Sequence, residues 1–251
     1  MQTTAIRYQV RPMDIADISQ VMEIERQSFA AMWPETAFKR ELQRNRLARY
    51  LVAVEQRLET EDEGARPEPP PEADLPSAEA EGIGPPPAHT EPPPSPRVTQ
   101  PHLGRWLAEL KRLFGSEEEP GPLASREPIV GIVGIWLSVG EAHIVTIAVP
   151  ESHRRRGIGE LLLIAAIQLA ILNDREVVTL ECRVSNETAR ALYEKYGFRR
   201  VDIRPRYYSD NQEDALIMTT ESIHSPSYQA LFQRLQQEHR ERCGDYQLAF
   251  S

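Results

Sequence analysis

Glycines and arginines are concentrated at one turn between a predicted strand and a predicted helix. The stretch reads Arg154-Arg-Arg-Gly157-Ile-Gly159 and follows Val149. Glycine lets the backbone come close to a ligand, and the first N–H groups of a helix, together with the helix dipole, favour phosphate oxygens. We therefore predict an anion site at this turn, with positive charge from the arginines at its rim. A glycine-containing helix entry with solvated arginines is the alternative interpretation.

A second group of candidate residues lies on the next strand and helix. Alternation along the strand places Glu181 on one face and Cys182 on the other, so we expect Cys182 in the core. Asn186 follows at the strand-to-helix turn, and Tyr193 lies two helical turns later on the same helix face. Carboxylates and phenols are side chains that move protons in active sites. The structural alternatives are an ion pair of Glu181 with Arg183, a helix cap at Asn186 and core packing of Tyr193.

These residues belong to a predicted alternation of strands and helices, which indicates a mixed α/β domain. Apolar residues at helical spacing define the N-terminal helices, with Asp14 as an N-cap and Pro34 in a first turn. The predicted helices cover residues 15–28, 34–46, 158–173, 186–196 and 226–242. The predicted strands cover residues 5–11, 50–54, 129–137, 142–149, 177–184 and 215–219, with one more beginning at Phe198.

Residues 57–126 interrupt this pattern. Of the 21 prolines in the chain, 13 fall within residues 57–101, and residues 57–96 carry −8 of the net charge of −9. Such a segment cannot bury enough apolar surface to offset its ordering entropy, so we expect a disordered insertion. An apolar helical stripe near 103–114 lies within it, and would either dock on the domain or bind a protein partner.

Composition argues against several classes of protein. The chain has two cysteines and no Cys-x-x-Cys spacing, so neither a disulfide framework nor a metal site is expected, and His143 and His153 are interpreted as incidental. Outside the acidic segment the charge is nearly neutral, which argues against a nucleic-acid partner. The most apolar stretch, Ile158–Leu172, is shorter than the roughly 20 residues of a membrane span, and the N-terminus lacks the order of a secretory signal. We therefore expect a cytoplasmic protein without a membrane partner.

Both motifs resemble those of the GNAT acetyltransferase superfamily. Within it, the stretch Thr179–Phe198 is similar to the RimI family of bacterial ribosomal-protein alanine N-acetyltransferases, as are Glu25–Phe29 with Trp33-Pro34, Glu141–Val149 and Arg206–Met218. The similarity covers about residues 5–56 and 127–219. It implies a single GNAT-fold domain formed by residues 1–56 and 127–220, with a mixed central sheet, splayed strands and flanking helices. The insertion 57–126 and a C-terminal helical tail, residues 221–251, fall outside the similarity.

The resemblance also implies roles for single residues. Acetyl-CoA would be the cosubstrate, without a metal, and a set of strand, loop and cap residues would bind it: Ile147, Ala148, Val149, Arg154, Arg155, Arg156, Gly157, Ile158, Gly159 and Asn186. Glu181 would be the base that takes the proton of the amine, and Tyr193 the acid that protonates the departing thiolate. Trp33, Tyr207 and Tyr208 would border the groove for the acceptor peptide. Glu160 departs from the pattern, because it puts a carboxylate next to the expected phosphates.

The reaction implied by the resemblance is direct acetyl transfer to the N-terminal amine of a protein, with an alanine-starting protein of the small ribosomal subunit as the expected acceptor. Two alternatives stay open. GNAT folds also host acetyl transfer to lysine side chains or small amines, and an interaction protein with a vestigial catalytic domain would instead use the insertion and the tail. Substituting Gly157 by valine is expected to abolish cofactor binding and to leave the fold intact.

Overall fold

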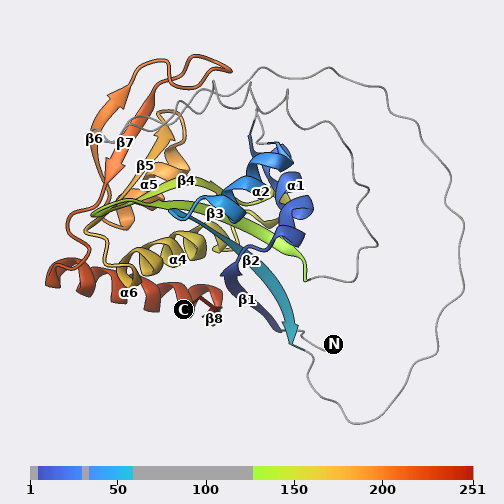
Figure 1. Ribbon diagram of the computed structural model, residues 1–251. Coiled ribbons are helices and arrows are strands. Elements are labelled where there is room, and N and C mark those ends of the chain that lie inside the picture. The colour runs from blue at the N-terminus through green and yellow to red at the C-terminus, as the bar shows by residue number, and fades with distance from the viewer. Residues whose placement is uncertain (1–4, 30–33, 59–126, 251) are drawn as a thin grey trace, which may run out of the picture.

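The computed structural model describes residues 5–29, 34–58 and 127–250 of the chain. Trp33 and the apolar stripe at 103–114 lie outside the described residues, as does nearly all of the insertion expected at 57–126. Figure 1 shows the sheet and the helices that the described residues form.

One mixed sheet of eight strands organises the described part of the chain, in the order β6-β7-β5-β4-β3-β2-β1-β8. Its strands are β1 (Ala5–Pro12), β2 (Ala48–Leu58), β3 (Ile129–Leu137), β4 (Glu141–Ala148), β5 (Val177–Arg183), β6 (Arg199–Arg204), β7 (Ala215–Thr219) and β8 (Tyr246–Leu248). Neighbouring strands are antiparallel except for two parallel pairs, β4 with β5 and β1 with β8. The predicted mixed α/β fold is confirmed, and β8 is a strand that the sequence did not predict.

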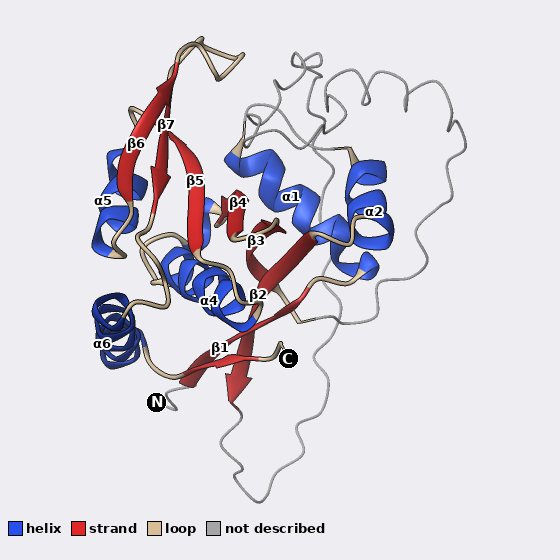
Figure 2. Cartoon of the chain, turned by 60° about the vertical axis from the view of Figure 1, so that its left-hand side comes forward, coloured by secondary structure: helices blue, strands red, loops and turns tan. Residues whose placement is uncertain are grey.

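Helices cover both faces of this sheet (Figure 2). The helices α1 (Ile18–Ser28) and α2 (Glu35–Arg44) pack on one face, and α4 (Ile158–Leu172) packs on the other. The helix α5 (Glu187–Lys195) lies near β6 and β7, and α6 (Pro226–Cys243) lies against α4. Every residue from Leu161 to Ile167 is fully buried, because the sheet covers one side of α4 and α6 covers another.

Within the described residues, each helix and strand predicted there occurs, with shifted ends. β2 differs most, because its antiparallel register with β1 continues to Leu58 instead of stopping at Val54. The helix α2 ends earlier than predicted, at Arg44. Asn45 follows it as the C-cap, and the side chain of Asn45 accepts a hydrogen bond from the N–H of Leu47. Strand pairing sets the end of β2, and a helix cap sets the end of α2. Both depend on contacts with residues that are close in the folded chain.

The C-terminal segment is packed onto the domain. Four residues of α6 at helical spacing are buried, Tyr228, Phe232, Leu235 and His239, and the first three belong to the same hydrophobic core as α4. After Gly244 the chain enters β8, which pairs in parallel with β1. The predicted helix at 226–242 is therefore present, and it joins the domain core along one apolar stripe.

The two central parallel strands separate along their length. Pairing between β4 and β5 runs only from Glu141 to Ile144 on β4 and from Val177 to Leu180 on β5. Beyond that point β4 pairs with β3 alone and β5 pairs with β7 alone. The splayed strands that the resemblance implies are confirmed. None of the helices among the described residues has the length and apolarity needed to span a lipid bilayer.

Candidate active site

The turn between β4 and α4 carries backbone N–H groups that face no carbonyl. The short 3-10 helix η2 (Glu151–His153) leads into it, and Arg155 and Gly157 have left-handed backbone angles, with φ of 65° and 81°. Gly157 caps α4 without a side-chain hydrogen bond to the first helical turn. Within the described residues, the N–H groups of residues 155–160 donate to no backbone carbonyl. Such a run of free N–H groups at a helix start suits an anion.

Gly157 and Gly159 differ in the space that surrounds them. A Cβ on Gly157 would lie 2.5 Å from Cys243 Sγ and 3.1 Å from His239 Nε2, whereas a Cβ on Gly159 would meet only Val149 Cγ2, at 3.8 Å. Gly157 is thus required by the fold, and Gly159 leaves space beside the free N–H groups. A ligand could therefore approach the backbone at Gly159, as an anion site at a helix start requires. The expectation that Gly157→Val leaves the fold intact is wrong, because the new side chain would collide with α6 and would need a strained backbone angle.

The three arginines are exposed, and two of them brace the turn. Arg154 Nε donates to the carbonyl of Val149 at 3.2 Å, and an Arg156 Nη2 group donates to the carbonyl of Ser152 at 3.1 Å. Arg155 is exposed at the left-handed position of the turn. The turn therefore carries three positive charges on exposed side chains.

Glu160, the residue that departs from the family pattern, points away from the turn into a cluster of donors. Lys195 Nζ and the Tyr196 hydroxyl each donate to its Oε1 at 2.8 Å, and Arg242 donates to its Oε2. These donors hold the pKa of Glu160 below its ordinary value against the opposing effect of burial. The carboxylate is charged but compensated, so its place in the first turn of α4 is compatible with a bound phosphate.

β4 offers a free backbone edge beside this turn. Its residues Thr146 to Ala148 pair with β3 on one side and with no strand on the β5 side. The side chains of Ile147 and Val149 are partly buried, and those of Ala148 and Ile158 are buried, so mainly the backbone of these residues is available to a ligand. An unpaired strand edge of this kind fits the amides of a pantetheine arm.

Glu181 lies one residue beyond Leu180, the last residue of β5 that pairs with β4, so it stands where β4 and β5 begin to separate. Its side chain is only 8% exposed, and its Oε2 lies 3.0 Å from His143 Nε2 on β4. Its Oε1 lies 3.7 Å from a guanidinium nitrogen of Arg204 on β6. Arg183 turns elsewhere, so the ion pair between Glu181 and Arg183 does not form.

His143 is not incidental, contrary to the sequence-based interpretation. Its Nδ1 lies 2.8 Å from Thr179 Oγ1, and Thr179 in turn donates to Glu141 Oε1. The parallel register sets His143 beside Thr179, two residues before Glu181 on the same face of β5. Sequence reasoning missed this contact because it requires the register between β4 and β5. His153 lies apart, with Ser152 Oγ 2.9 Å from its Nδ1.

Tyr193 and Cys182 lie on the opposite face of the sheet from Glu181. Tyr193 is 5% exposed on α5, with its ring 5.8 Å from that of Phe198, and burial raises the pKa of its phenol. Cys182 is buried, its Sγ lies 3.7 Å from Met218 Sδ, and burial raises the pKa of its thiol to about 11. A thiol that stays protonated is a poor nucleophile, so Cys182 belongs to the core as predicted.

Asn186 is the N-cap of α5. Its side-chain oxygen accepts a hydrogen bond from the N–H of Ala189 at 3.1 Å. The predicted cap is therefore confirmed. A contact between Asn186 and acetyl-CoA stays a prediction, which the exposed position of this residue at the end of β5 allows.

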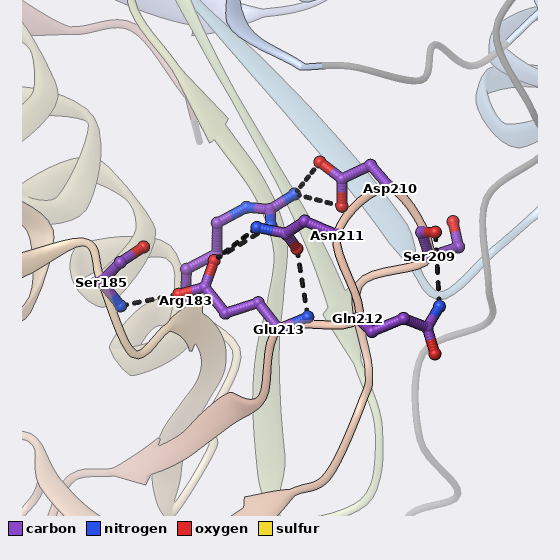
Figure 3. A network of polar contacts seen from close by, with 7 residues as sticks. All are labelled: Arg183, Ser185, Ser209, Asp210, Asn211, Gln212 and Glu213. Carbon is purple, nitrogen blue, oxygen red and sulfur yellow. Dashed lines mark hydrogen bonds and ion pairs between the residues drawn. The ribbon is translucent and has the colours of Figure 1, made fainter.

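The loop between β6 and β7 is tied to the end of β5 by a polar network (Figure 3). Arg183 donates to both oxygens of Asp210, at 3.0 and 2.8 Å, and to Asn211 and Glu213 at 3.0 and 3.2 Å. The N–H of Ser185 donates to Glu213 Oε1 at 2.7 Å. Hydrogen bonds led by the one from Ser185 lower the pKa of Glu213 to about 2. This network fixes a loop that the sequence alone leaves undefined.

The same network positions the two predicted groove tyrosines. The Tyr208 ring lies under the Arg183 guanidinium, 3.8 Å from ring centroid to carbon, and packs edge-on against Tyr207 with ring centroids 5.1 Å apart. Burial raises the pKa of both phenols, and the Glu181 carboxylate adds to the rise for each. Both tyrosines are partly buried on the loop between β6 and β7. Trp33, the third predicted groove residue, is outside the described part of the chain.

Comparisons with known proteins agree with this geometry. A model of the acetyltransferase (GNAT) family matches residues 87–198. A relative from Bacillus subtilis (strain 168), named putative [ribosomal protein bS18]-alanine N-acetyltransferase, is 30% identical over 209 residues, which cover 83% of this chain and 92% of the relative. An N-alpha-acetyltransferase from Saccharolobus solfataricus is 46% identical over 82 residues, but this match covers 32% of the chain and about half, 48%, of that relative.

A solved structure shows the same fold. The crystal structure of the ribosomal-protein-S18-alanine N-acetyltransferase from Escherichia coli superposes with a TM-score of 0.53 at 18% identity, over 87% of this chain and 97% of that chain. The chain belongs to the GNAT acetyltransferase family. It is an acetyl-CoA-dependent N-acetyltransferase, and its relatives include proteins named [ribosomal protein bS18]-alanine N-acetyltransferase.

Proposed function

We propose that this enzyme acetylates the N-terminal amine of a protein, and that its acceptor is an alanine-starting protein of the small ribosomal subunit. The name of the Bacillus subtilis relative, at 30% identity over most of the chain, supports alanine and a ribosomal protein, and the name of the archaeal relative supports an α-amine. We also propose that the enzyme acts in the cytoplasm, where it would meet this acceptor.

The observation that carries this proposal is the position of the Glu181 carboxylate. It is nearly buried, it stands where β4 and β5 separate, and it contacts His143 Nε2 at 3.0 Å. An α-amino group has a pKa near 8 and is mostly protonated at pH 7, so acetylation requires a base. A shielded carboxylate at the opening between the strands supports that role.

The hydrogen-bond pattern around His143 favours uptake of a proton. Thr179 donates to Glu141, so its oxygen accepts from His143 Nδ1–H. His143 Nε2 then faces Glu181 Oε2, and a hydrogen bond between them needs one proton on either atom. When that proton is missing, two acceptors face each other. The pair therefore gains a hydrogen bond when Glu181 removes a proton from the amine.

The same contacts form a route for this proton to leave. Glu181 passes it to His143 Nε2, His143 releases the proton on Nδ1 to Thr179, and Thr179 releases its own proton to Glu141. The Glu141 side chain is 22% exposed, so the chain of four groups joins the buried base to solvent. One proton enters and one leaves, and the transfer leaves His143 protonated on Nε2 instead of Nδ1. The tautomer of His143 and the orientation of the Thr179 hydroxyl must therefore be reset before the next cycle.

The proposed acid, Tyr193, lies on the face of the sheet opposite Glu181. Bound acetyl-CoA supplies the acetyl group as a thioester, and free N–H groups at the β4 edge polarise its carbonyl. Tyr193 keeps its proton at neutral pH because burial raises its pKa. We assign to its hydroxyl the protonation of the departing sulfur, and Asn186 and the turn at residues 154–159 to cofactor binding. Transfer is direct, since the only buried thiol nearby, Cys182 among the described residues, is held protonated.

We propose that the β6–β7 loop, which its polar network ties to the end of β5, borders the site for the acceptor. Tyr207 and Tyr208 are partly buried, and the Arg183 guanidinium lies over the Tyr208 ring. We propose that these two rings pack around the first residues of the acceptor so that its amine reaches Glu181. A small first side chain such as that of alanine suits a site enclosed by two aromatic rings.

The test is acetyl transfer to defined acceptors. Purified protein is incubated with isotope-labelled acetyl-CoA and a panel of peptides, and mass spectra locate the label. The panel contains alanine-starting peptides from small-subunit ribosomal proteins, the same peptides with blocked N-termini and internal lysines, and small polyamines. We expect label at the free α-amine of the alanine-starting peptides and none on the blocked forms.

Two results would contradict the proposal. Label confined to lysines or polyamines would change the acceptor class while leaving the fold and cofactor unaffected. No transfer to any acceptor, with acetyl-CoA bound, would favour the interaction protein with a vestigial catalytic domain. Glu181→Gln serves as the control for enzymatic transfer, since it keeps the shape of the side chain and removes the base.

A further inference from the structure

The C-terminal helix α6 reaches the anion turn with two side chains. His239, one turn before the end of α6, has its Nε2 3.0 Å from the carbonyl oxygen of Gly157. Arg242, three residues later, donates to Glu160 in the first turn of α4. Residues that are 82 positions apart in the chain therefore meet at the N-terminus of α4 (Figure 1).

The contact with Gly157 is buried and closely packed. His239 is 2% exposed, and its ring packs edge-on against Tyr246 of β8 with ring centroids 5.4 Å apart. The space where a Gly157 Cβ would stand is filled by Cys243 Sγ and His239 Nε2. A carbonyl acceptor requires a proton on His239 Nε2. The same carbonyl accepts the N–H of Leu161, the first hydrogen bond of α4.

These contacts orient the groups that would meet the diphosphate. The carbonyl of Gly157 belongs to the peptide unit whose N–H is that of Ile158, at the start of α4. A hydrogen bond that fixes this carbonyl therefore fixes the direction of the neighbouring free N–H. Arg242 keeps the Glu160 carboxylate turned toward α5 and α6, away from the turn. The fixed direction of the Ile158 N–H favours an anion through geometry, and the turning away of the Glu160 carboxylate favours it through charge.

We propose that His239 is a positioning residue for acetyl-CoA, which holds the Gly157 peptide so that the turn at residues 155–159 is ready for a diphosphate before it arrives. The inference rests on the proposed cofactor site. In this proposal α6 and β8, together named the clasp, hold the turn from the side of His239. The pairing of β8 with β1 anchors them. Preorganisation of this kind raises affinity by lowering the ordering cost of binding.

The clasp also has a pH dependence with a defined sign. Burial lowers the pKa of His239, and Arg242 and Lys195 add to the lowering, whereas the Gly157 carbonyl and Glu160 oppose it. Tyr246 and Cys243 complete its surroundings. Within the described residues His239 Nδ1 has no hydrogen-bond partner, so protonation would bury an N–H without an acceptor. The neutral ring is therefore the working form, and the clasp weakens only as pH falls below the ordinary histidine value of about 6.5.

The test compares two substitutions of His239 with a matched control. His239→Leu removes the donor, whereas His239→Gln keeps an N–H near the place of Nε2 and cannot titrate. Tyr228→Phe is the control, since Tyr228 on α6 also donates from a buried side chain to a backbone carbonyl, that of Tyr196 at 3.1 Å. The Kd of coenzyme A is measured by calorimetry from pH 5.5 to 8, the unfolding temperature by scanning fluorimetry, and kcat with saturating acetyl-CoA.

We expect His239→Leu to raise the Kd of coenzyme A about tenfold at pH 7.5, as for loss of one hydrogen bond, with kcat within twofold of the unchanged protein. His239→Gln should restore most of the affinity and remove the rise in Kd at acid pH. Tyr228→Phe should lower the unfolding temperature to a similar extent as His239→Leu while leaving the Kd unchanged.

Equal Kd values for His239→Leu and the unchanged protein would overturn the inference and leave the cofactor site standing. So would a Kd that rises equally in Tyr228→Phe, because the effect would then follow general loosening of α6. If the unchanged protein binds no coenzyme A, or if Gly159→Val binds it normally, the cofactor site itself is wrong and the clasp has no ligand to serve.

Discussion

Gly159→Val should separate cofactor affinity from folding. Gly159 is the second residue of α4, and a Cβ there meets only Val149 Cγ2 at 3.8 Å. Valine is slightly more favourable than glycine inside a helix, by roughly 0.4 kcal/mol. At this chain length such a difference shifts the unfolding temperature by no more than about 2 °C. The folded protein should therefore tolerate the new side chain.

The effect on acetyl-CoA should be large by comparison. The branched side chain would occupy the space beside the free N–H groups of the turn. A hydrogen bond to a charged group contributes about 1.5–3 kcal/mol, so losing two of them costs about 3–6 kcal/mol. This corresponds to a rise in Kd of roughly 100-fold to 10,000-fold. Calorimetry with coenzyme A and scanning fluorimetry measure the two quantities on the same sample.

Gly157→Ala is the contrasting variant. A left-handed backbone angle costs a non-glycine residue about 1–2 kcal/mol, and overpacking against Cys243 about 1–3 kcal/mol more. The free energy of unfolding should fall by about 2–5 kcal/mol, and the unfolding temperature by roughly 5–15 °C. A folded Gly159→Val protein with unchanged affinity for coenzyme A would refute the placement of the diphosphate at this turn.

Four further substitutions test the chemistry and the loop. Glu181→Gln should lower kcat at least about 100-fold at pH 7, and the loss should shrink as the pH of the rate profile rises above the amine pKa near 8; an equal loss at every pH would indicate a positioning role instead. Tyr193→Phe should lower kcat about tenfold or more with both KM values within twofold, and a larger change in KM would mean that the phenol binds substrate. Thr179→Val interrupts the proton chain and should lower kcat about tenfold in steady-state assays, whereas full activity would show that the amine proton leaves by another route. The network lowers the pKa of Glu213 to about 2 from its ordinary value near 4.5, so its stabilising effect is complete above pH 4.5 and is lost as pH falls toward 2. Glu213→Gln should therefore flatten that part of the curve of unfolding temperature against pH. An unchanged curve would contradict this role of the Glu213 carboxylate.

The elements of this fold follow from local patterns. Alternation along β5 placed Glu181 and Cys182 on opposite faces, and the structure confirms both positions. The helix predicted over residues 158–173 occurs as α4, Ile158–Leu172, and most of its residues are buried. Asn186 was predicted as a possible cap because short polar side chains at helix starts accept backbone N–H groups, and it is one.

What the sequence did not reveal depends on contacts between distant segments. His143 becomes a partner of Glu181 only through the register of β4 with β5, and local alternation carries no such register. β8 is three residues long and exists because β1 has an open edge beside it. Glu160 looked out of place beside a phosphate site, since its three donors lie on α5 and α6. Each of these features requires the tertiary arrangement.

The most direct test of the central claim is a crystal structure of the protein with coenzyme A and an alanine-starting peptide. We expect the diphosphate oxygens within hydrogen-bond distance of the N–H groups at residues 155–159, and the peptide amine on the Glu181 side of the opening between β4 and β5. A diphosphate bound at another helix, or a Glu181 carboxylate turned away from the amine, would contradict the account.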